Sequence, residues 1–352
     1  MNIVSFKKKV AIVGAGLYGC YIGKYLSNLN KYDITLFDKN TPDLDYASMI
    51  NQFRIHRGYH YPRCEETLIE IQQSEKEFDY WFKKDYFNIP SYYVISRENS
   101  LTNSVEYESF MKKWGLGYTV VKNDILLKNF NLKQIETIYE VEEYILNKNS
   151  VFDFITNIKN EFNTKYKFVK YEDVKEKYDI IIVCAYANTN TFFDNFPEHK
   201  ITNLKFELCY KPCIDTTNRF FKQSSVVVID GNFCCSNPIN LNKDIYLGSV
   251  SHGIVKTCKF KDNSKLSDYN SEFYCNKFEC FKNLFNDYFN NYNMILKSNN
   301  LVWKVVFDNV EDTDERHTLV KKINDNTITV LSGKLNTCVF AKDKILEYLK
   351  YM

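Results

Sequence analysis

Short apolar runs and helical periodicity alternate at the start of the chain. Val10–Val13 is a continuous apolar run, and residues 17–28 repeat apolar side chains at helical spacing. Ile34–Phe37 is a second apolar run, which ends at Asp38. This pattern predicts a β-turn-α-β unit of about 30 residues, the size expected of such a crossover.

Strands and helices remain interleaved along the rest of the chain. Helices are expected at 65–84, 151–162 and 336–350, and helical, aromatic-rich sequence fills 265–296. Strands are expected at Ser91–Ser96, Tyr118–Val121, Ile138–Leu146, Lys167–Lys170, Ile180–Ala185, Leu204–Ile214, Ser225–Asp230, Ile245–Ser251, Leu301–Phe307 and Thr327–Leu331.

The order of these elements predicts two domains through which the chain passes repeatedly. Segments of β-α-β character occur at both ends and in the middle, with blocks typical of antiparallel strands between them. We therefore expect an α/β protein with a Rossmann-like domain and a second domain of mostly antiparallel sheet plus helices. The first is assigned to residues 1–85, 150–203 and 300–352, and the second to residues 86–149 and 204–299.

Composition excludes several classes of protein. The 46 basic and 44 acidic residues nearly cancel, so a nucleic-acid partner is not expected. The eleven cysteines form no Cys-x-x-Cys pair, and we predict no metal site. No apolar stretch has the length of a membrane span and no signal-peptide pattern is present, so we expect a cytoplasmic protein. The oligomeric state stays open.

A glycine-rich turn gives the sharpest functional signal. Gly14-x-Gly16-x-x-Gly19 follows the first predicted strand and opens the first predicted helix. In a dinucleotide-binding turn these glycines permit a tight bend, close approach of the backbone to a pyrophosphate, and close helix-strand packing. The helix N-terminus adds unpaired N–H groups and a positive dipole end. The predicted contacts are Gly14, Ala15, Gly16, Leu17, Tyr18 and Gly19; a glycine-rich turn without a ligand is the alternative.

An acidic residue stands at the end of the second predicted strand. Asp38 can accept hydrogen bonds from the ribose of an adenosine, and its charge disfavours a 2′-phosphate, so NADP is not expected. Lys39 follows it directly and belongs to the same predicted cofactor site.

The segment Ala47–Arg63 favours FAD over NAD. It is polar, aromatic and basic, whereas an NAD domain would continue through alternating β-α units. The segment resembles the loop after the second strand in the D-amino-acid-oxidase-like (DAO) superfamily of FAD-dependent oxidoreductases. Within that superfamily it is most similar to L-2-hydroxyglutarate-type oxidases and to flavoproteins encoded near surface-polysaccharide genes. The resemblance implies cofactor contacts from Asn51, Arg54 and His56.

Two later segments extend the resemblance, which covers about half of the chain (roughly 9–63, 167–190 and 302–345). Lys170–Val174 and Tyr178–Ala185 look like the family's adenine-binding strand pair, although Tyr186 and Ala187 replace its usual Thr and Gly. The contacts implied there are Tyr171 and Ala185.

The third segment is similar to the family's closing pattern of an Arg-Pro pair, a strand, and a glycine before the last helix. Asp314–His317 precedes Thr327–Leu331 and Ser332–Thr337, with His317 in place of the proline. The resemblance places this last helix N-terminus against the flavin pyrimidine ring. The implied contacts are Gly333, Lys334, Leu335 and Asn336.

The resemblance implies an enzyme that oxidises a C–N or C–O bond of a small amine, amino acid or 2-hydroxy acid by hydride transfer to FAD. Dioxygen or another acceptor would then reoxidise the flavin. A substrate carboxylate requires a guanidinium, and the resembling families place one at Arg316. The alternatives are a surface arginine in an acidic loop (Asp312, Asp314 and Glu315), or Arg54 or Arg57 in this role. Those two arginines are equally suited to cofactor phosphates or to nearby acids.

His252, at the end of the strand predicted at Ile245–Ser251, is the candidate base for a hydroxy-acid substrate. A structural role stays open for each of the five histidines. Three other functions also stay open: an NAD-linked dehydrogenase, a flavoenzyme of surface-glycan or sugar biosynthesis without net redox chemistry, and a non-catalytic dinucleotide-binding protein.

Overall fold

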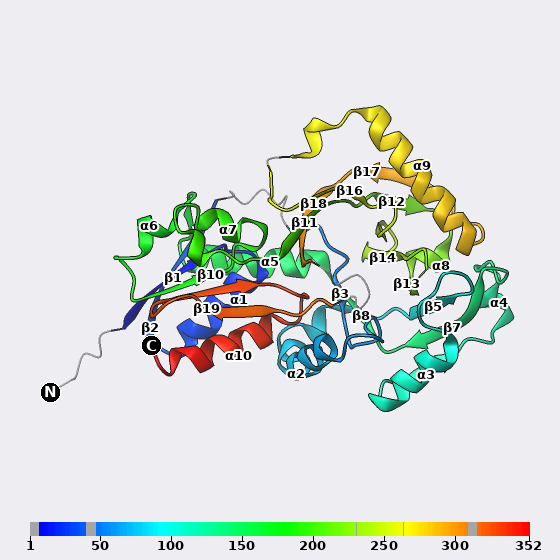
Figure 1. Ribbon diagram of the computed structural model, residues 1–352. Coiled ribbons are helices and arrows are strands. Elements are labelled where there is room, and N and C mark those ends of the chain that lie inside the picture. Colours follow the sequence, from blue (N-terminus) through cyan, green and yellow to red (C-terminus); the bar gives the residue numbers. More distant parts are fainter. Residues whose placement is uncertain (1–6, 40–46, 230, 263, 309–314) are drawn as a thin grey trace.

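The computed structural model describes residues 7–39, 47–229, 231–262, 264–308 and 315–352. A six-stranded sheet in the order β19-β20-β10-β1-β2-β9 forms one side of the molecule (Figure 1). Its neighbouring strands are parallel except for the antiparallel pair β19 and β20. The strands are β1 (Lys8–Val13), β2 (Tyr32–Asp38), β9 (Lys165–Tyr166), β10 (Ile180–Val183), β19 (Leu319–Lys322) and β20 (Thr327–Leu331).

Alternating side chains of the central strands bury both faces of this sheet. Val10 and Ile12 pack with apolar side chains of helices α1, α2, α5 and α10, whereas Ala11 and Val13 pack with the α7 segment on the opposite face. Figure 1 shows α6 and α7 on one side of the sheet and α10 on the other. The helices are α1 (Leu17–Asn28), α2 (Glu65–Phe82), α5 (Lys148–Glu161), α6 (Tyr171–Val174), α7 (Thr189–Phe192) and α10 (Cys338–Leu349).

An eight-stranded mixed sheet forms the other side, in the order β17-β12-β15-β14-β13-β5-β7-β6. Its pairs are antiparallel except for β13 with β5. The aromatic face of helix α9 (Ser271–Tyr288) covers this sheet. The strands are β5 (Ser91–Ser96), β6 (Tyr118–Val120), β7 (Ile135–Val141), β12 (Cys213–Thr216), β13 (Ser225–Ile229), β14 (Cys234–Asn240), β15 (Asp244–Ser249) and β17 (Met294–Ser298).

Two antiparallel three-stranded sheets, β16-β11-β18 and β3-β8-β4, complete the described strands. β18 belongs to the segment assigned to the first domain, yet it pairs with β11 from the segment assigned to the second. The strands are β3 (Arg54–Ile55), β4 (Tyr86–Phe87), β8 (Tyr144–Leu146), β11 (Leu204–Tyr210), β16 (Ile254–Cys258) and β18 (Leu301–Phe307). The remaining helices are α3 (Ser104–Lys113), α4 (Asp124–Leu127), α8 (Arg219–Lys222) and the 3₁₀ turns η1 (Lys83–Asp85), η2 (Tyr186–Asn188), η3 (Pro197–His199) and η4 (Leu266–Asp268).

The predicted fold class, a Rossmann-like α/β unit with a mostly antiparallel sheet region, is confirmed. The exact domain boundaries stay a prediction. The first unit is also correct in detail, since α1 has the predicted bounds and both flanking strands are present.

Three predicted segments were wrong in extent. Ile138–Leu146 is divided between β7 and β8, because the chain turns at Glu142 and Glu143. Leu204–Ile214 is divided between β11 and β12 around Pro212, which lacks the N–H that a continuing strand needs. In the segment predicted as helical at 265–296, helix α9 ends at Tyr288, and strand β17 (Met294–Ser298) follows.

The predicted strand at Lys167–Lys170 is also wrong. Strand β9 ends at Tyr166, just before this segment; it is two residues long and pairs with the end of β2 through Phe37 and Asp38. The following residues continue along the carboxyl edge of the sheet instead. The predicted end of the strand at Ser225–Asp230 lies outside the described residues.

Candidate functional site

A cavity of about 570 Å³ lies at the carboxyl ends of β1, β2 and β10. β1 lies between β2 and β10 in the sheet, so the connections that leave the carboxyl ends of neighbouring strands diverge here. Open α/β sheets bind ligands at such a topological switch point. The structure brings six of the predicted cofactor contacts to its wall: Gly14, Ala15, Gly16, Asp38, Lys39 and Ala185.

The glycine-rich turn has the geometry that its sequence predicts. Gly14 has φ +100°, and a Cβ there would lie 2.4 Å from the backbone oxygen of Cys184 in the neighbouring turn. At Gly16, the residue before helix α1, a Cβ would lie 2.9 Å from Ser48 Oγ. The absence of both side chains therefore lets the backbone of the turn pack directly against the end of β10 and against Ser48.

Ser48 was not predicted from the sequence as a residue of this site. Its hydroxyl accepts a hydrogen bond from the Leu17 N–H at 3.0 Å, in the first turn of α1, and Ser48 also lines the cavity. The residue lies in the polar loop that follows β2, and its hydroxyl was the sequence feature from which a role in the site could have been predicted. The loop is held in place by Asn51, whose side-chain amide donates to the Ala47 and Ser48 carbonyls at 3.0 and 2.9 Å.

The Asp38 carboxylate forms an ion pair with Lys159 Nζ at 2.8 Å, and both side chains are buried. Lys159 comes from α5, and nothing in the sequence marked it as a partner of Asp38. The pair balances the charge of the carboxylate while Asp38 still lines the cavity.

The cavity suits an extended dinucleotide such as FAD. Its volume lies within the range of small-molecule sites, and the glycine-rich turn forms part of its wall. Trp303 also lines the cavity. The residues present therefore fit the cofactor that the resemblance implies.

The predicted contacts near the C-terminus form a turn beside Tyr18 and outside the cavity wall. The Tyr18 hydroxyl donates to the Lys334 carbonyl at 2.5 Å, and the Asn336 side-chain amide donates to the His56 carbonyl at 2.9 Å. Gly333 and Leu335 belong to the same turn, and α10 begins after it at Cys338, two residues later than predicted. The structure thus joins the glycine-rich turn and the loop at Ala47–Arg63 to the C-terminal segment.

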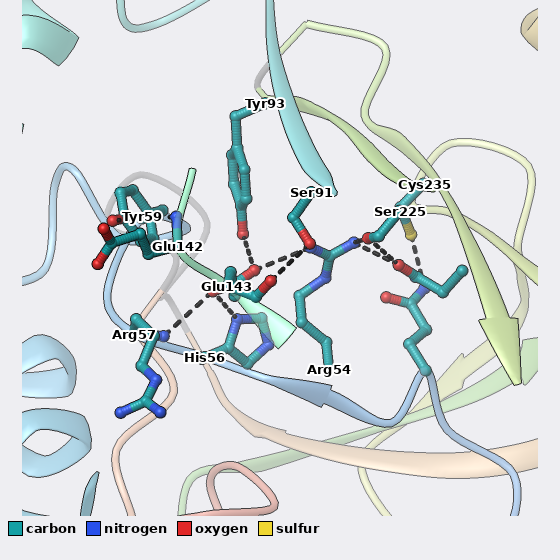
Figure 2. Close-up of polar contacts among 12 residues, drawn as sticks. Arg54, His56, Arg57, Tyr59, Ser91, Tyr93, Glu142, Glu143, Ser225 and Cys235 are labelled. Atoms are coloured by element: carbon teal, nitrogen blue, oxygen red, sulfur yellow. Dashed lines mark hydrogen bonds and ion pairs between the residues drawn. The ribbon is translucent and has the colours of Figure 1, made fainter. Parts of the chain in front are cut away.

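A buried network centred on Glu143 lies beside this turn (Figure 2). Oε2 of Glu143 accepts from Arg54 Nη1 at 2.8 Å and from the Tyr93 hydroxyl at 2.6 Å. Oε1 contacts His56 Nδ1 at 3.2 Å and accepts from the Arg57 N–H at 3.2 Å. The Arg54 guanidinium also donates to the buried side chains of Ser225 and Asn237 on the eight-stranded sheet.

Burial opposes the charge of Glu143, but its contacts with His56 and Arg54 outweigh burial and lower its pKa below 4.5. Burial also lowers the pKa of His56 to about 4, although Glu143 acts in the opposite direction. His56 is therefore neutral near pH 7. Its Nδ1–H can then donate to the ionised Glu143.

Arg57 pairs with two acids on helix α2. Its guanidinium donates to both oxygens of Asp79, at 2.8 and 2.7 Å, and forms an ion pair with Glu75. Of the roles left open for Arg54 and Arg57, the structure thus shows pairing with acids. Glu143, the central acid, was missed because it comes from the turn between β7 and β8, where the sequence predicts a continuous strand.

Tyr171 was predicted to lie in a strand, and this prediction is wrong. The residue begins the short helix α6, and its buried ring packs against Phe192, Phe193 and Phe196. The cavity wall at this place is formed by Lys167, Phe168 and Val169 instead. Tyr186 has φ 49°, and its hydroxyl accepts from the Val305 N–H at 3.1 Å, so it replaces the family's Thr with a contact to β18.

The two predicted substrate residues lie outside the cavity wall. Arg316 donates from Nη1 to the Glu315 carbonyl at 2.7 Å, and its own N–H donates to Thr67 Oγ1. His252 lies in the turn between β15 and β16, where its N–H donates to Ser249 Oγ. Neither residue shares a contact with the Glu143 network in the described structure. Asp312 and Asp314, which were to form an acidic loop with Glu315, lie outside the described residues.

Glu70 connects helix α2 to the C-terminal turn. Its carboxylate accepts from the Thr318 N–H at 2.8 Å, and Thr318 Oγ1 in turn accepts from the Gly333 N–H at 3.2 Å. Burial raises the pKa of Glu70 to about 7. Folded protein therefore keeps this proton between about pH 4.5 and 7, where the unfolded chain has lost it.

We expect Glu70→Gln to stabilise the protein relative to wild type at pH 8 by up to about 3 kcal/mol, and to have little effect at pH 5. The raised pKa means that this group's stabilising contribution is lost as the pH rises through about 7. Urea unfolding at both pH values measures the difference. Glu66→Gln, on the exposed face of the same helix, is the control, and an equal difference at pH 5 and 8 would contradict the assignment.

Within the described residues, none of the helices combines the length and apolarity needed to cross a membrane. The same part of the chain contains no group of three or more His, Cys, Asp or Glu side chains placed to hold a metal ion.

Comparison with solved structures identifies the fold. Glycine oxidase from Geobacillus kaustophilus aligns with a TM-score of 0.68 at 11% identity, covering 98% of this chain and 95% of that one. Iminodiacetate oxidase (IdaA) from Chelativorans sp. BNC1 has a TM-score of 0.68 at 9% identity, with 97% and 95% covered. L-Proline dehydrogenase from P. horikoshii has a TM-score of 0.69 at 10% identity, with 98% and 94% covered. The chain has the fold of DAO-like flavoenzymes, so the sequence resemblance is confirmed at this level.

Sequence comparison gives a shorter match. The chain is 30% identical over 111 residues to the FAD-dependent monooxygenase FPY4 of Fusarium mangiferae. This match spans 31% of the chain and 30% of that relative's length. A scan of protein families found no match.

Proposed function

We propose that this chain is an FAD-dependent oxidoreductase that oxidises the C–N bond of a small amine or amino acid. The single observation that carries the proposal is the cavity at the switch point of the parallel sheet, lined by the glycine-rich turn and Asp38. The whole-chain likeness to glycine oxidase and iminodiacetate oxidase, and the partial match to an FAD-dependent monooxygenase, favour FAD and an amine substrate. A 2-hydroxy acid, with C–O oxidation, stays the second candidate from the sequence.

In this proposal FAD supplies the hydride acceptor, and dioxygen or another acceptor completes the cycle. The chain's own residues bind the cofactor and orient it. Gly14 and Gly16 line the cavity beside the first turn of α1, whose N–H groups and dipole favour an anion such as the pyrophosphate. Asp38 accepts from the adenosine ribose, and the turn at Gly333–Asn336 lies beside His56. Arg316 stays the proposed carboxylate ligand and His252 the proposed base for a hydroxy-acid substrate.

The direct test is the visible spectrum of the purified protein, followed by anaerobic titration with amines, amino acids and 2-hydroxy acids. We expect bound flavin that an amine or amino acid bleaches. A protein that takes up no FAD on reconstitution but binds NAD would support a dehydrogenase. A bound flavin that no substrate reduces would favour a flavoenzyme without net redox chemistry, or a non-catalytic binder.

Asp38 gives a residue-level test of cofactor binding. We expect Asp38→Asn to weaken FAD binding by about tenfold, because the amide loses the charge that strengthens the ribose hydrogen bonds. The same change leaves Lys159 buried without its carboxylate and lowers stability. Flavin fluorescence measures the affinity, and thermal unfolding of the apoprotein measures the stability.

The double variant Asp38→Asn, Lys159→Met separates these two effects. It removes both charges, so we expect stability to recover while FAD binding stays weak. If FAD affinity recovers together with stability, Asp38 acts through the fold and does not contact the ribose.

A further inference from the structure

The cavity carries an excess of positive charge that the glycine-rich turn does not explain. Its lining includes four lysines and one carboxylate, Asp38, which is already paired with Lys159. The four lysines are Lys39, Lys167, Lys261 and Lys265. A cavity lined by one sign of charge concentrates ligands of the opposite sign, so the wall is suited to a polyanion.

Two of these lysines approach the cavity from different parts of the fold. Lys39 follows β2 of the parallel sheet, and its ammonium donates to Asn188 Oδ1 at 3.3 Å. Lys261 belongs to the connection between β16 and α9, which comes from the segment assigned to the second domain. Figure 1 shows this connection, in yellow, on the side of the molecule where α7 lies, and residues of both segments line the same cavity.

The local structure directs Lys261 toward the cavity. Its ammonium donates to the Asp262 carbonyl at 3.1 Å and lies 5.8 Å from the ring centroid of Trp303, which lines the cavity. The Asp262 carboxylate is bound by Lys256 and by the Ser264 N–H. Within the described ranges, neither Lys39 nor Lys261 has a carboxylate within ion-pair distance. Burial and the nearby charge of Lys39 lower the pKa of Lys261, as expected where a cation lacks an anion.

We infer that Lys261 and Lys39 together bind the pyrophosphate of the dinucleotide, so that the β16–α9 connection contributes to cofactor recognition. The inference rests on the proposed function insofar as the dinucleotide is FAD. An ammonium suits this role because it acts as a compact point charge on phosphate oxygens. A pyrophosphate diester carries two negative charges, which match the charges of the two ammonium groups. The first turn of α1 would bind the same group.

Lys261→Met tests the inference through ligand affinity alone. Calorimetric titration of the apoprotein would use FAD, ADP and adenosine, since only the first two contain a pyrophosphate. We expect the variant to bind FAD and ADP about tenfold more weakly than wild type and adenosine equally well. Its FAD affinity should also fall less steeply with added salt, because one phosphate contact is missing.

Two control variants keep the test specific. Lys261→Arg retains the charge and should keep most of the affinity, and Lys259→Met, at an exposed lysine of the same connection, should match wild type. Unchanged FAD and ADP affinity in Lys261→Met would overturn the inference and leave the proposed function intact. An equal loss for adenosine would also overturn it, because it would indicate packing. If wild type binds ADP through Lys261 but does not bind FAD, the inference holds and the proposed function fails.

Discussion

Replacing Arg54 by methionine is expected to lower the free energy of unfolding by about 3–5 kcal/mol. The guanidinium is the closest cation to Glu143, whose side chain is fully buried. Without Arg54 the carboxylate stays ionised in a medium that solvates it poorly, or it takes up a proton at a cost in free energy. The change also removes the hydrogen bonds to Ser225 and Asn237, which connect β3 to the eight-stranded sheet.

The Arg54→Met effect is measured by urea unfolding at pH 7. The double variant Arg54→Met, Glu143→Gln should regain at least half of the lost stability, because it removes both buried charges. Arg219→Met, at an exposed arginine whose Nε donates to Gln223, should change the free energy of unfolding by less than about 0.5 kcal/mol. A double variant no more stable than Arg54→Met would show that the loss arises from packing.

The second large effect is expected at the glycine-rich turn. Gly14→Ala should weaken FAD binding by about 100-fold. A non-glycine residue at φ +100° is strained, which costs up to about 3 kcal/mol, and its Cβ would meet the Cys184 carbonyl at 2.4 Å. Relief of this contact requires the turn to move away from β10, and the first turn of α1 would move with it. Retention of FAD through desalting and its dissociation constant measure the effect.

Gly115 provides a matched control for the backbone strain alone. It also has a positive φ, +64°, but a Cβ there would meet no atom within 4 Å, and it does not line the cavity. Gly115→Ala should therefore cost about 1 kcal/mol of stability and leave FAD affinity unchanged. Equal loss of FAD in both variants would show that the Gly14 effect is a general consequence of instability.

Local sequence signals were sufficient to predict the strands and the turn that form the framework of the proposed cofactor site. The spacing of Gly14, Gly16 and Asp38 depends on one β-α-β unit, so its geometry is encoded within about 30 consecutive residues. The strand predicted at Ile180–Ala185, which the structure contains as β10 (Ile180–Val183), was equally clear, because a strand buried on both faces must be apolar throughout.

The partners of these residues could not be found in the same way. Lys159 binds Asp38 from α5, and Glu143 binds Arg54 from a turn that the pattern predicts as strand. Lys261 reaches the cavity from a connection after β16. Each is a charged residue with no periodic signal, and its role arises only from tertiary packing. The prediction of a strand at Tyr171 was wrong for a related reason. The ring of Tyr171 packs in an aromatic cluster, and this packing favours a helical turn that strand propensity does not predict.

The order of strands in the parallel sheet has a consequence for biosynthesis. β10 ends at Val183, whereas its neighbour β20 begins only at Thr327, so most of the chain is synthesised before this pairing can form. Until then one edge of β10 exposes unpaired backbone groups and apolar side chains, a template for association between nascent chains. A ribosome paused between these two strands would therefore carry an aggregation-prone intermediate, and chaperone demand should be greatest over that interval.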